Sequence, residues 1–92
     1  MARSTKIEGL TLYQSLLCPF CVKTRKALKN LDMKVAMKDV GLSGKVKQEL
    51  TRGGGKGQVP CLRIERKGEP TKWLYESNDI IRYFKDRKAN SL

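Results

Sequence analysis

Near its N-terminus the chain alternates apolar and polar residues, and a longer helical pattern follows. Residues 10–14 repeat with a period of two, which predicts a half-buried β-strand. Residues 19–31 repeat apolar positions at helical spacing and predict an amphipathic helix that begins at Pro19, where a missing N–H costs nothing. Its expected buried face holds Phe20, Thr24, Ala27, Leu28 and Leu31. The expected solvent-facing residues are Lys23, Arg25, Lys26 and Lys29.

The middle of the chain predicts a strand, a short helix and a loop. Residues 35–37 are β-prone, and we expect a second strand there. Ser43 or Gly44 is placed to cap a helix over residues 45–52. The glycine run at residues 53–57 is expected to end this helix and to form a flexible loop.

The last third of the chain predicts a hairpin and a final helix. Residues 59–66 and 71–75 are expected to be strands, joined by a turn at residues 67–70. Ser77 is a good N-cap for a helix over residues 77–88. That helix is expected to bury Ile80, Ile81 and Phe84.

The order of the predicted elements, βαβαββα, indicates an α/β fold. The first two strands with the helix between them form a parallel unit with a right-handed crossover. The last two strands are close enough in sequence to pair antiparallel. We therefore predict one domain spanning residues 1–92, with a core at about residues 10–88, built as a four-stranded mixed sheet flanked by three helices.

Composition narrows the class of protein. The chain has 92 residues, of which 39% are hydrophobic and 32% charged, and its formal net charge is +11. It contains no apolar run of the ~18–20 residues that a membrane helix needs, and its first six residues lack the apolar stretch of a secretory signal. We expect a cytoplasmic monomer with no membrane partner. The positive charge attracts anions, but its spread over both halves disfavours nucleic acid as the main partner.

The cysteines are the first candidates for chemistry. The chain has three cysteines and no histidine, and two of the cysteines are spaced as Cys18-Pro19-Phe20-Cys21. A closed zinc site needs four ligands, and with only Cys61 left as a third thiolate it would require a carboxylate. No metal is therefore expected. The third cysteine follows Pro60 in a predicted strand, where a buried, structural role is the ordinary one.

The position of this dithiol at a helix start favours redox chemistry. Cys18 would lie just before the first turn, where the N–H groups of Phe20 and Cys21 lack helical partners. These groups and the helix dipole stabilise a thiolate. We predict that Cys18 is the nucleophile and that Cys21, one turn further in, resolves the mixed disulfide. The alternatives are half of a metal site or two ordinary buried cysteines.

Two further segments are candidates for binding. Pro60 begins a strand, and statistics of X–Pro bonds favour a trans bond. If the bond is cis, the Val59 backbone can pair with an extended thiol peptide. The N–H groups at the helix start near Ser77 and Asn78 suit a carboxylate, and Asp79 suits an ammonium group. A plain helix cap with a complementary acid is the more common explanation of the second pattern.

Together these motifs resemble the glutaredoxin family. The resemblance rests on Cys18-Pro19-Phe20-Cys21 after a strand, Val59-Pro60 at the head of the third strand, and Glu76-Ser77-x-Asp79-Ile80 opening the last helix. It spans residues 10–88 and implies a thioredoxin-like fold. The Glu-Ser-x-x-Ile form is also similar to the thioredoxin-like half of glutathione transferases. Those enzymes have a helical second domain that 92 residues are too few to hold, and they do not rely on a dithiol.

The resemblance implies glutathione as the cosubstrate. The residues expected to contact it are Phe20, Gln58, Val59, Pro60, Ser77, Asn78 and Asp79. Val59 would pair with the cysteinyl backbone beside a cis Pro60. The amides of Ser77 and Asn78 would take the γ-glutamyl carboxylate, and Asp79 would take its ammonium group. The glutathione sulfur would be held by the first cysteine of the motif.

Several positions depart from the glutaredoxin pattern. Gln58 stands where the family often has threonine, and Ser15 stands where a lysine is common. The segment Tyr75-Glu76 replaces the usual Gly-Gly. These differences remove the usual contact to the glycine carboxylate of glutathione. We expect Lys56 or Arg52 to replace that contact.

The predicted function is a glutathione-dependent thiol–disulfide oxidoreductase. Its partners would be glutathione and proteins that carry disulfides or glutathione adducts. One alternative is an iron–sulfur carrier in which Cys18 thiolates from two chains and two glutathiones hold a cluster, although Pro19 should hinder cluster access. The other is a thioredoxin-fold binding module that uses the +11 charge for an acidic partner or nucleic acid.

Overall fold

The predicted order of strands and helices is confirmed. The computed structural model describes residues 7–90, so the prediction about a leader in residues 1–6 lies outside the described part. The elements are β1 (Leu10–Gln14), α1 (Pro19–Asn30), β2 (Ala36–Asp39), α2 (Gly44–Gly54), β3 (Cys61–Ile64), β4 (Lys72–Leu74) and α3 (Ser77–Asn90). Within the described residues, none of the helices is both long and apolar enough to cross a membrane.

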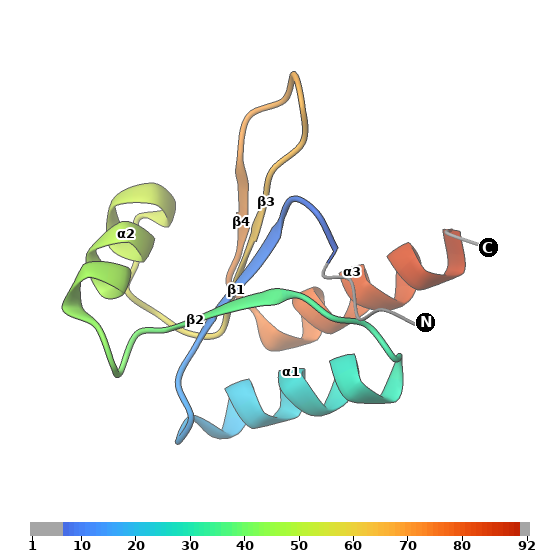
Figure 1. Ribbon diagram of the computed structural model, residues 1–92, viewed down its shortest axis with the longest axis horizontal. Coiled ribbons are helices and arrows are strands. Elements are labelled where there is room, and N and C mark those ends of the chain that lie inside the picture. The colour runs from blue at the N-terminus through green and yellow to red at the C-terminus, as the bar shows by residue number, and fades with distance from the viewer. Residues whose placement is uncertain (1–6, 91–92) are drawn as a thin grey trace, which may run out of the picture.

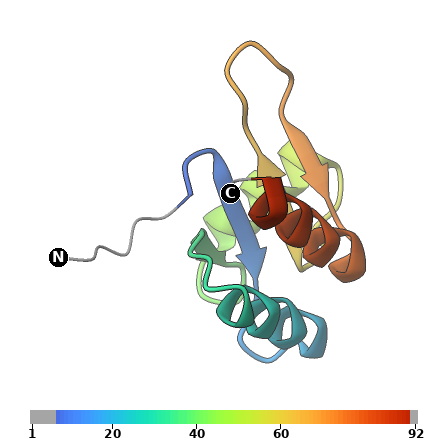
Figure 2. The same ribbon diagram turned by 90° about the vertical axis from the view of Figure 1, so that its right-hand side faces the viewer.

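The four strands form one mixed sheet in the order β2-β1-β3-β4. β1 pairs in parallel with β2, whereas the β1–β3 and β3–β4 pairs are antiparallel. Helices α1 and α3 pack side by side on one side of the sheet, and α2 lies on the other side (Figures 1 and 2). The predicted architecture of a four-stranded sheet with three flanking helices is therefore confirmed.

Alternation along the strands divides the core between the two sides of the sheet. Leu12 and Leu62 pack with Leu28, Ile80 and Phe84 of the helices, all of them almost completely buried. The neighbouring strand residues Tyr13 and Cys61 point the opposite way and form a second cluster with Leu50 of α2. Because successive side chains of a strand alternate between faces, one strand supplies both clusters.

Helix α1 is rotated relative to the predicted face. Phe20 was expected to be buried, but 60% of its surface is exposed. Its place is taken by Cys21, which is buried with Thr24 and Leu28 at spacings of three and four residues. The Thr24 hydroxyl donates a hydrogen bond of 2.9 Å to the Phe20 carbonyl, so its burial leaves no unpaired group. The rotation places the second thiol of the motif inside the protein.

The glycine run is not simply a flexible loop. Helix α2, capped at Ser43, continues through Gly53 and Gly54 and ends at Gly55, which has a φ of 92°. A side chain at Gly53 would overlap the Trp73 ring, and one at Gly54 would overlap the Tyr75 hydroxyl. The predicted helix end at residue 52 is therefore two residues too early, and the two helical glycines pack against aromatic residues.

The remaining boundaries differ by a few residues. The second strand begins one residue late, at Ala36, because Val35 packs into the core before the ladder starts. The third strand begins only after Pro60, which has no N–H for the ladder. Ser77 is the first helical residue of α3 rather than its N-cap. The Ile80 N–H donates to the Glu76 carbonyl at 2.9 Å, so the cap position is Glu76.

Substitution of Gly53 by alanine should destabilise the fold by about 1–3 kcal/mol, because overpacking against Trp73 outweighs the better helix propensity of alanine. The matched control is Gly44→Ala, since a Cβ at Gly44 in the first turn of the same helix meets open space. We expect that control to be neutral or slightly stabilising. Urea denaturation of both variants measures the free energies of unfolding, and equal values would contradict the packing explanation.

Candidate active site

Cys18 is the N-cap residue of α1 and lies in the loop between β1 and α1. Figure 1 shows that this loop leads directly from the end of β1 into α1. Its backbone is extended, with φ −77° and ψ 122°, and Pro19 occupies the first turn as predicted. The Val22 N–H donates to the Cys18 carbonyl at 3.0 Å, which is the first hydrogen bond of the helix. The N–H groups between these two residues therefore have no helical partner and remain available to the sulfur.

These groups lower the pKa of the Cys18 thiol below its ordinary value. Partial burial by itself acts to raise the pKa, but hydrogen bonds from the Cys21 backbone and thiol and from the Phe20 backbone outweigh it. The positive charge of Arg25 lowers it further. The predicted asymmetry of the two thiols thus has a physical basis in the first turn of the helix.

Cys21 has the opposite properties. It is fully buried, and desolvation is the main reason that its pKa is raised to about 11. The Ser15 N–H donates to its sulfur at 3.4 Å, which works against this rise. The hydrogen bond and negative charge of Cys18 add to the rise. Both cysteines are free thiols.

Arg25 belongs to the site, although the sequence pattern placed it on the solvent face. Its guanidinium group donates to the Gln14 side chain and to the carbonyls of Ser15 and Leu16, the last two at 3.3 and 3.4 Å. These bonds hold the loop that precedes Cys18. A spacing of seven residues puts Arg25 on the same helix face as Cys18, two turns away, and this was the signal available in the sequence.

The Val59–Pro60 segment lies against the reactive thiol. The bond between these residues is cis, as the resemblance to glutaredoxins implies, whereas X–Pro statistics alone favour trans. The distance from the Cys18 Sγ to the Val59 carbonyl oxygen is 3.9 Å. Pro60 is buried and Val59 half-buried, so of these two residues Val59 is the more accessible one beside the sulfur.

The start of α3 is the third part of the predicted site. The Ser77, Asn78 and Asp79 N–H groups precede the first helical hydrogen bond and have no helical acceptor. The Lys23 ammonium donates to the Asn78 side chain at 2.7 Å and connects this helix start to α1. An anion placed here would therefore face N–H dipoles and a nearby cation.

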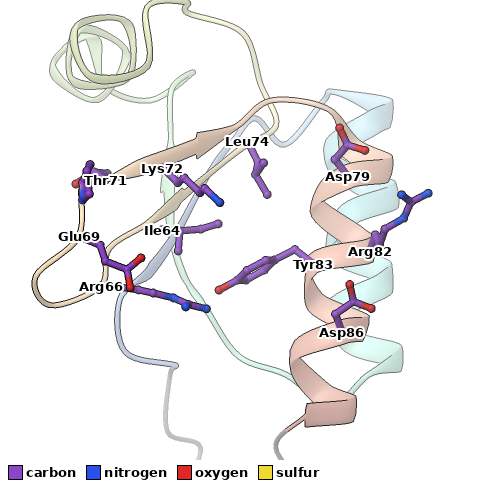
Figure 3. Close-up of a pocket in the computed structure, with 11 residues that line it drawn as sticks. Ile64, Arg66, Glu69, Thr71, Lys72, Leu74, Asp79, Arg82, Tyr83 and Asp86 are labelled. Carbon is purple, nitrogen blue, oxygen red and sulfur yellow. The ribbon is translucent and has the colours of Figure 1, made fainter.

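The Asp79 side chain lies at one end of a separate groove of about 470 Å³ between α3 and the β3–β4 hairpin. Figure 3 shows Asp79 at the start of α3, with Tyr83 pointing towards the strands and Arg66 and Lys72 opposite. Neither thiol of the motif nor Val59 lines this groove. A role for Asp79 in binding an ammonium group stays a prediction.

The loop before Val59 is held by Tyr75, which the sequence pattern marked only as a departure from a family motif. The Tyr75 hydroxyl donates to the Lys56 carbonyl at 2.9 Å, and the Lys56 N–H donates to the Tyr75 hydroxyl oxygen at 3.3 Å. The Lys56 ammonium lies 5.6 Å from the centre of the Tyr75 ring. Lys56 is thereby fixed three residues before Val59. Arg52, the other predicted cation, lines a different groove with Lys47 and Gln48.

The other predicted residues occupy ordinary positions. Gln58 and Phe20 are exposed near the Val59 segment and the helix start, respectively. Cys61 is fully buried, and desolvation raises its pKa to about 11. Among residues 7–90, no three His, Cys, Asp or Glu side chains come together in a way that could hold a metal ion. The thiol pair at the start of α1 is the candidate for chemistry in the described part of the chain.

The rate of alkylation by iodoacetamide should rise with pH through a midpoint below that of free cysteine, because the lowered pKa keeps Cys18 ionised there. Cys21→Ala removes a thiol hydrogen bond and should move this midpoint upward. Cys21→Ser retains a donor and serves as the control. Mass spectrometry identifies the labelled site, since Cys21 and Cys61, with pKa values of about 11, stay protonated. A midpoint equal to that of free cysteine would contradict the assignment.

Comparisons with solved structures show the same fold. The chain superimposes on glutathione transferase Omega 1C from Trametes versicolor with a TM-score of 0.72 and 23% identity, covering 92% of this chain and 39% of that one. For a trimeric glutathione transferase from Leishmania the TM-score is 0.69 and the identity is 24%. That match covers 85% of this chain and 17% of the Leishmania chain. For a Sulfitobacter glutathione transferase homologue with bound glutathione the TM-score is 0.70 and the identity is 20%. That match covers 91% of this chain and 39% of the homologue.

The chain thus spans at most about two fifths of the length of these three proteins. The match confirms the thioredoxin-like fold. None of the curated proteins matches the sequence. The family model for the glutathione S-transferase N-terminal domain matches residues 17–87, which include the dithiol, the Val59–Pro60 segment and the start of α3. This match covers most of the chain, and the protein therefore belongs to the family of glutathione S-transferase N-terminal domains.

Proposed function

We propose that the chain is a glutathione-dependent thiol–disulfide oxidoreductase of the glutaredoxin type. The observation that carries the proposal is the opposite shift of the two thiols across one helical turn. Cys18 is partly exposed with a lowered pKa, and Cys21 is buried with a pKa raised to about 11. A glutathione transferase that only binds and activates glutathione has no need of a second, buried thiol.

In the simplest reaction the Cys18 thiolate attacks the glutathione sulfur of a protein–glutathione mixed disulfide. The bond between that sulfur and the protein breaks, and the protein leaves as a thiolate. The thiolate of a second glutathione then attacks the glutathione sulfur bound to Cys18. Oxidised glutathione is formed, and Cys18 leaves as the thiolate that the helix start stabilises. Cys21 takes no part in this cycle.

Reduction of a protein disulfide uses both thiols. Cys18 first forms a mixed disulfide with the substrate, which removes the negative charge that contributes to the high pKa of Cys21. Cys21 then ionises more readily and attacks the Cys18 sulfur. The substrate leaves as a dithiol, and a Cys18–Cys21 disulfide remains. Two glutathione molecules supply the two electrons that restore the dithiol.

The proposed position of glutathione follows the Val59 backbone and the anion-binding groups. Its cysteinyl backbone pairs with Val59, and its γ-glutamyl carboxylate meets the free amides of Ser77 and Asn78, with Asp79 near the ammonium group. Lys56 is the better candidate for the glycine carboxylate, because Tyr75 fixes it close to Val59. The net charge of +11 favours this anionic cosubstrate. A reducing compartment such as the cytoplasm completes the proposal.

The family match favours a second candidate, the transfer of glutathione to an electrophile. In that reaction the glutathione thiolate itself attacks a carbon centre, and no disulfide forms. Conjugation of glutathione to a chloronitrobenzene substrate measures this activity directly. Conjugation without disulfide reduction would favour the second candidate over the first. Neither an iron–sulfur carrier nor a pure binding module needs a second, buried thiol with a raised pKa beside the first.

Cys18→Ser should abolish glutathione-dependent reduction of the mixed disulfide of glutathione and 2-mercaptoethanol, because no nucleophile remains at the helix start. Cys21→Ser should keep most of this activity and lose the reduction of protein disulfides. Coupling to glutathione reductase measures both reactions. An equal loss of both activities in the two variants would contradict the assigned roles.

Lys56→Ala should raise the KM for glutathione about fivefold and leave kcat unchanged, since an exposed charge-assisted contact contributes about 1 kcal/mol. Tyr75→Phe should raise the same KM by a smaller factor, because the loop loses its hydrogen bonds to the hydroxyl. Arg52→Ala is the control for removing a nearby positive charge. A larger effect of Arg52→Ala than of Lys56→Ala would assign the contact to Arg52.

A further inference from the structure

An apolar patch surrounds the reactive thiol. Of the six large apolar side chains that are exposed in the described part of the chain, four lie within four residues of Cys18. They are Leu16, Leu17, Phe20 and Val22, with exposed fractions of 61%, 92%, 60% and 43%. Scattered apolar residues are normal on a surface, but a cluster of this kind is typical of a contact site. Because the patch lies next to the nucleophile, it can contact a substrate that approaches the Cys18 sulfur.

The patch continues into a groove between α1 and α3. The groove has a volume of about 530 Å³ and begins at Pro19 and Val22, in the first turns of α1. It follows that helix to Asn30 and Leu31 at its other end. A helix rises ~1.5 Å per residue, so the groove runs for about 18 Å away from the thiol. That length accommodates about three turns of a partner helix.

The charges along this groove have one sign. Its ionisable lining residues are Lys23, Lys26 and Lys85, and no acidic side chain lines it. Between them the floor is apolar and is formed by Val22, Ala27, Leu31 and Ile81. A ligand that fits this lining is apolar on one face and carries carboxylates on both flanks. An amphipathic acidic helix has this pattern.

We propose that the patch and groove bind an acidic amphipathic segment next to the reactive cysteine of the substrate protein. The inference rests on the proposed function, because it treats the partner of Cys18 as a polypeptide. A second copy of this chain does not fit, since it brings the same lysines and a net charge of +11. Nucleic acid would meet the lysines but would leave the apolar floor without a partner. The glutathione positions beside Val59 stay free for the cosubstrate.

The binding test uses a fluorescein-labelled 12-residue peptide with leucines at i, i+4 spacing and glutamates on both flanks. Its comparator has glutamine in place of each glutamate. Two attractive charges at a rim contribute about 1.4 kcal/mol together, so the wild type should bind the glutamate peptide about tenfold more tightly. Fluorescence anisotropy measures both affinities. The salt concentration is 150 mM, because charges more than about 8 Å apart are then largely screened and the difference reports contacts within the groove.

The matched variants separate the groove from general charge. Lys26→Glu with Lys85→Glu should abolish the preference for the glutamate peptide. Lys45→Glu with Lys67→Glu makes the same change in net charge at exposed residues outside the groove and should retain the preference. Val22→Ser should weaken binding of the glutamate peptide about threefold through the lost apolar contact.

Three outcomes of the binding test would overturn the inference. They are equal affinity of the wild type for the two peptides, equal losses in the two double variants, and competition by duplex DNA as effective as that by unlabelled peptide. The last would show that the lysines attract any polyanion. Circular dichroism of each variant confirms that the fold is intact.

Turnover distinguishes this inference from the proposed function. The same two peptides, each with a central cysteine as a glutathione mixed disulfide, are compared with the small mixed disulfide of 2-mercaptoethanol. Reduction of all substrates with no preference for the glutamate peptide would leave the function intact and overturn the surface. Peptide binding with the expected preference but no reduction of any substrate would refute the function and support the surface. Faster reduction of the glutamate peptide than of the glutamine peptide supports both the proposed function and the proposed surface.

Discussion

The proposed chemistry of this protein depends on N–H groups that the first turn of α1 leaves without helical partners next to the Cys18 sulfur. Burial alone would raise the pKa of this thiol and disfavour the thiolate, and the backbone hydrogen bonds reverse that tendency. Arg25 contributes twice, through its charge and through the bonds that hold the loop before Cys18. A short stretch of one helix therefore sets the protonation state on which every proposed step depends.

The sheet brings the remaining parts to this helix start. The antiparallel register pairs Tyr13 of β1 with Cys61 of β3. Continuing that register brings Val59, two residues before Cys61, towards the loop that follows β1. This explains why the Val59 carbonyl lies 3.9 Å from the Cys18 sulfur although 41 residues separate them. The α1–α3 packing, with the Lys23–Asn78 hydrogen bond, adds the third part of the site.

Two aromatic residues, one in β4 and one just after it, fix the end of α2 and the loop that follows it. Trp73 packs against Gly53, and Tyr75 packs against Gly54 and holds the backbone of Lys56. A run of glycines in a sequence usually indicates a flexible loop. Here the same glycines end a helix and permit close contact, because only a residue without a Cβ fits against the rings. The run therefore contributes to a defined loop conformation ahead of Val59.

The sequence by itself determined the element order, the mixed sheet and the Cys18–Cys21 pair, because periodicity and the helix start depend on neighbouring residues. It placed Phe20 and Arg25 wrongly, since a helical pattern leaves the exact rotation of α1 open. Tertiary packing decided that rotation, which buried Cys21 instead of Phe20 and turned Arg25 towards the loop before Cys18. The fixing of Lys56 by Tyr75 also arose only in the folded chain, because the two residues are distant in sequence.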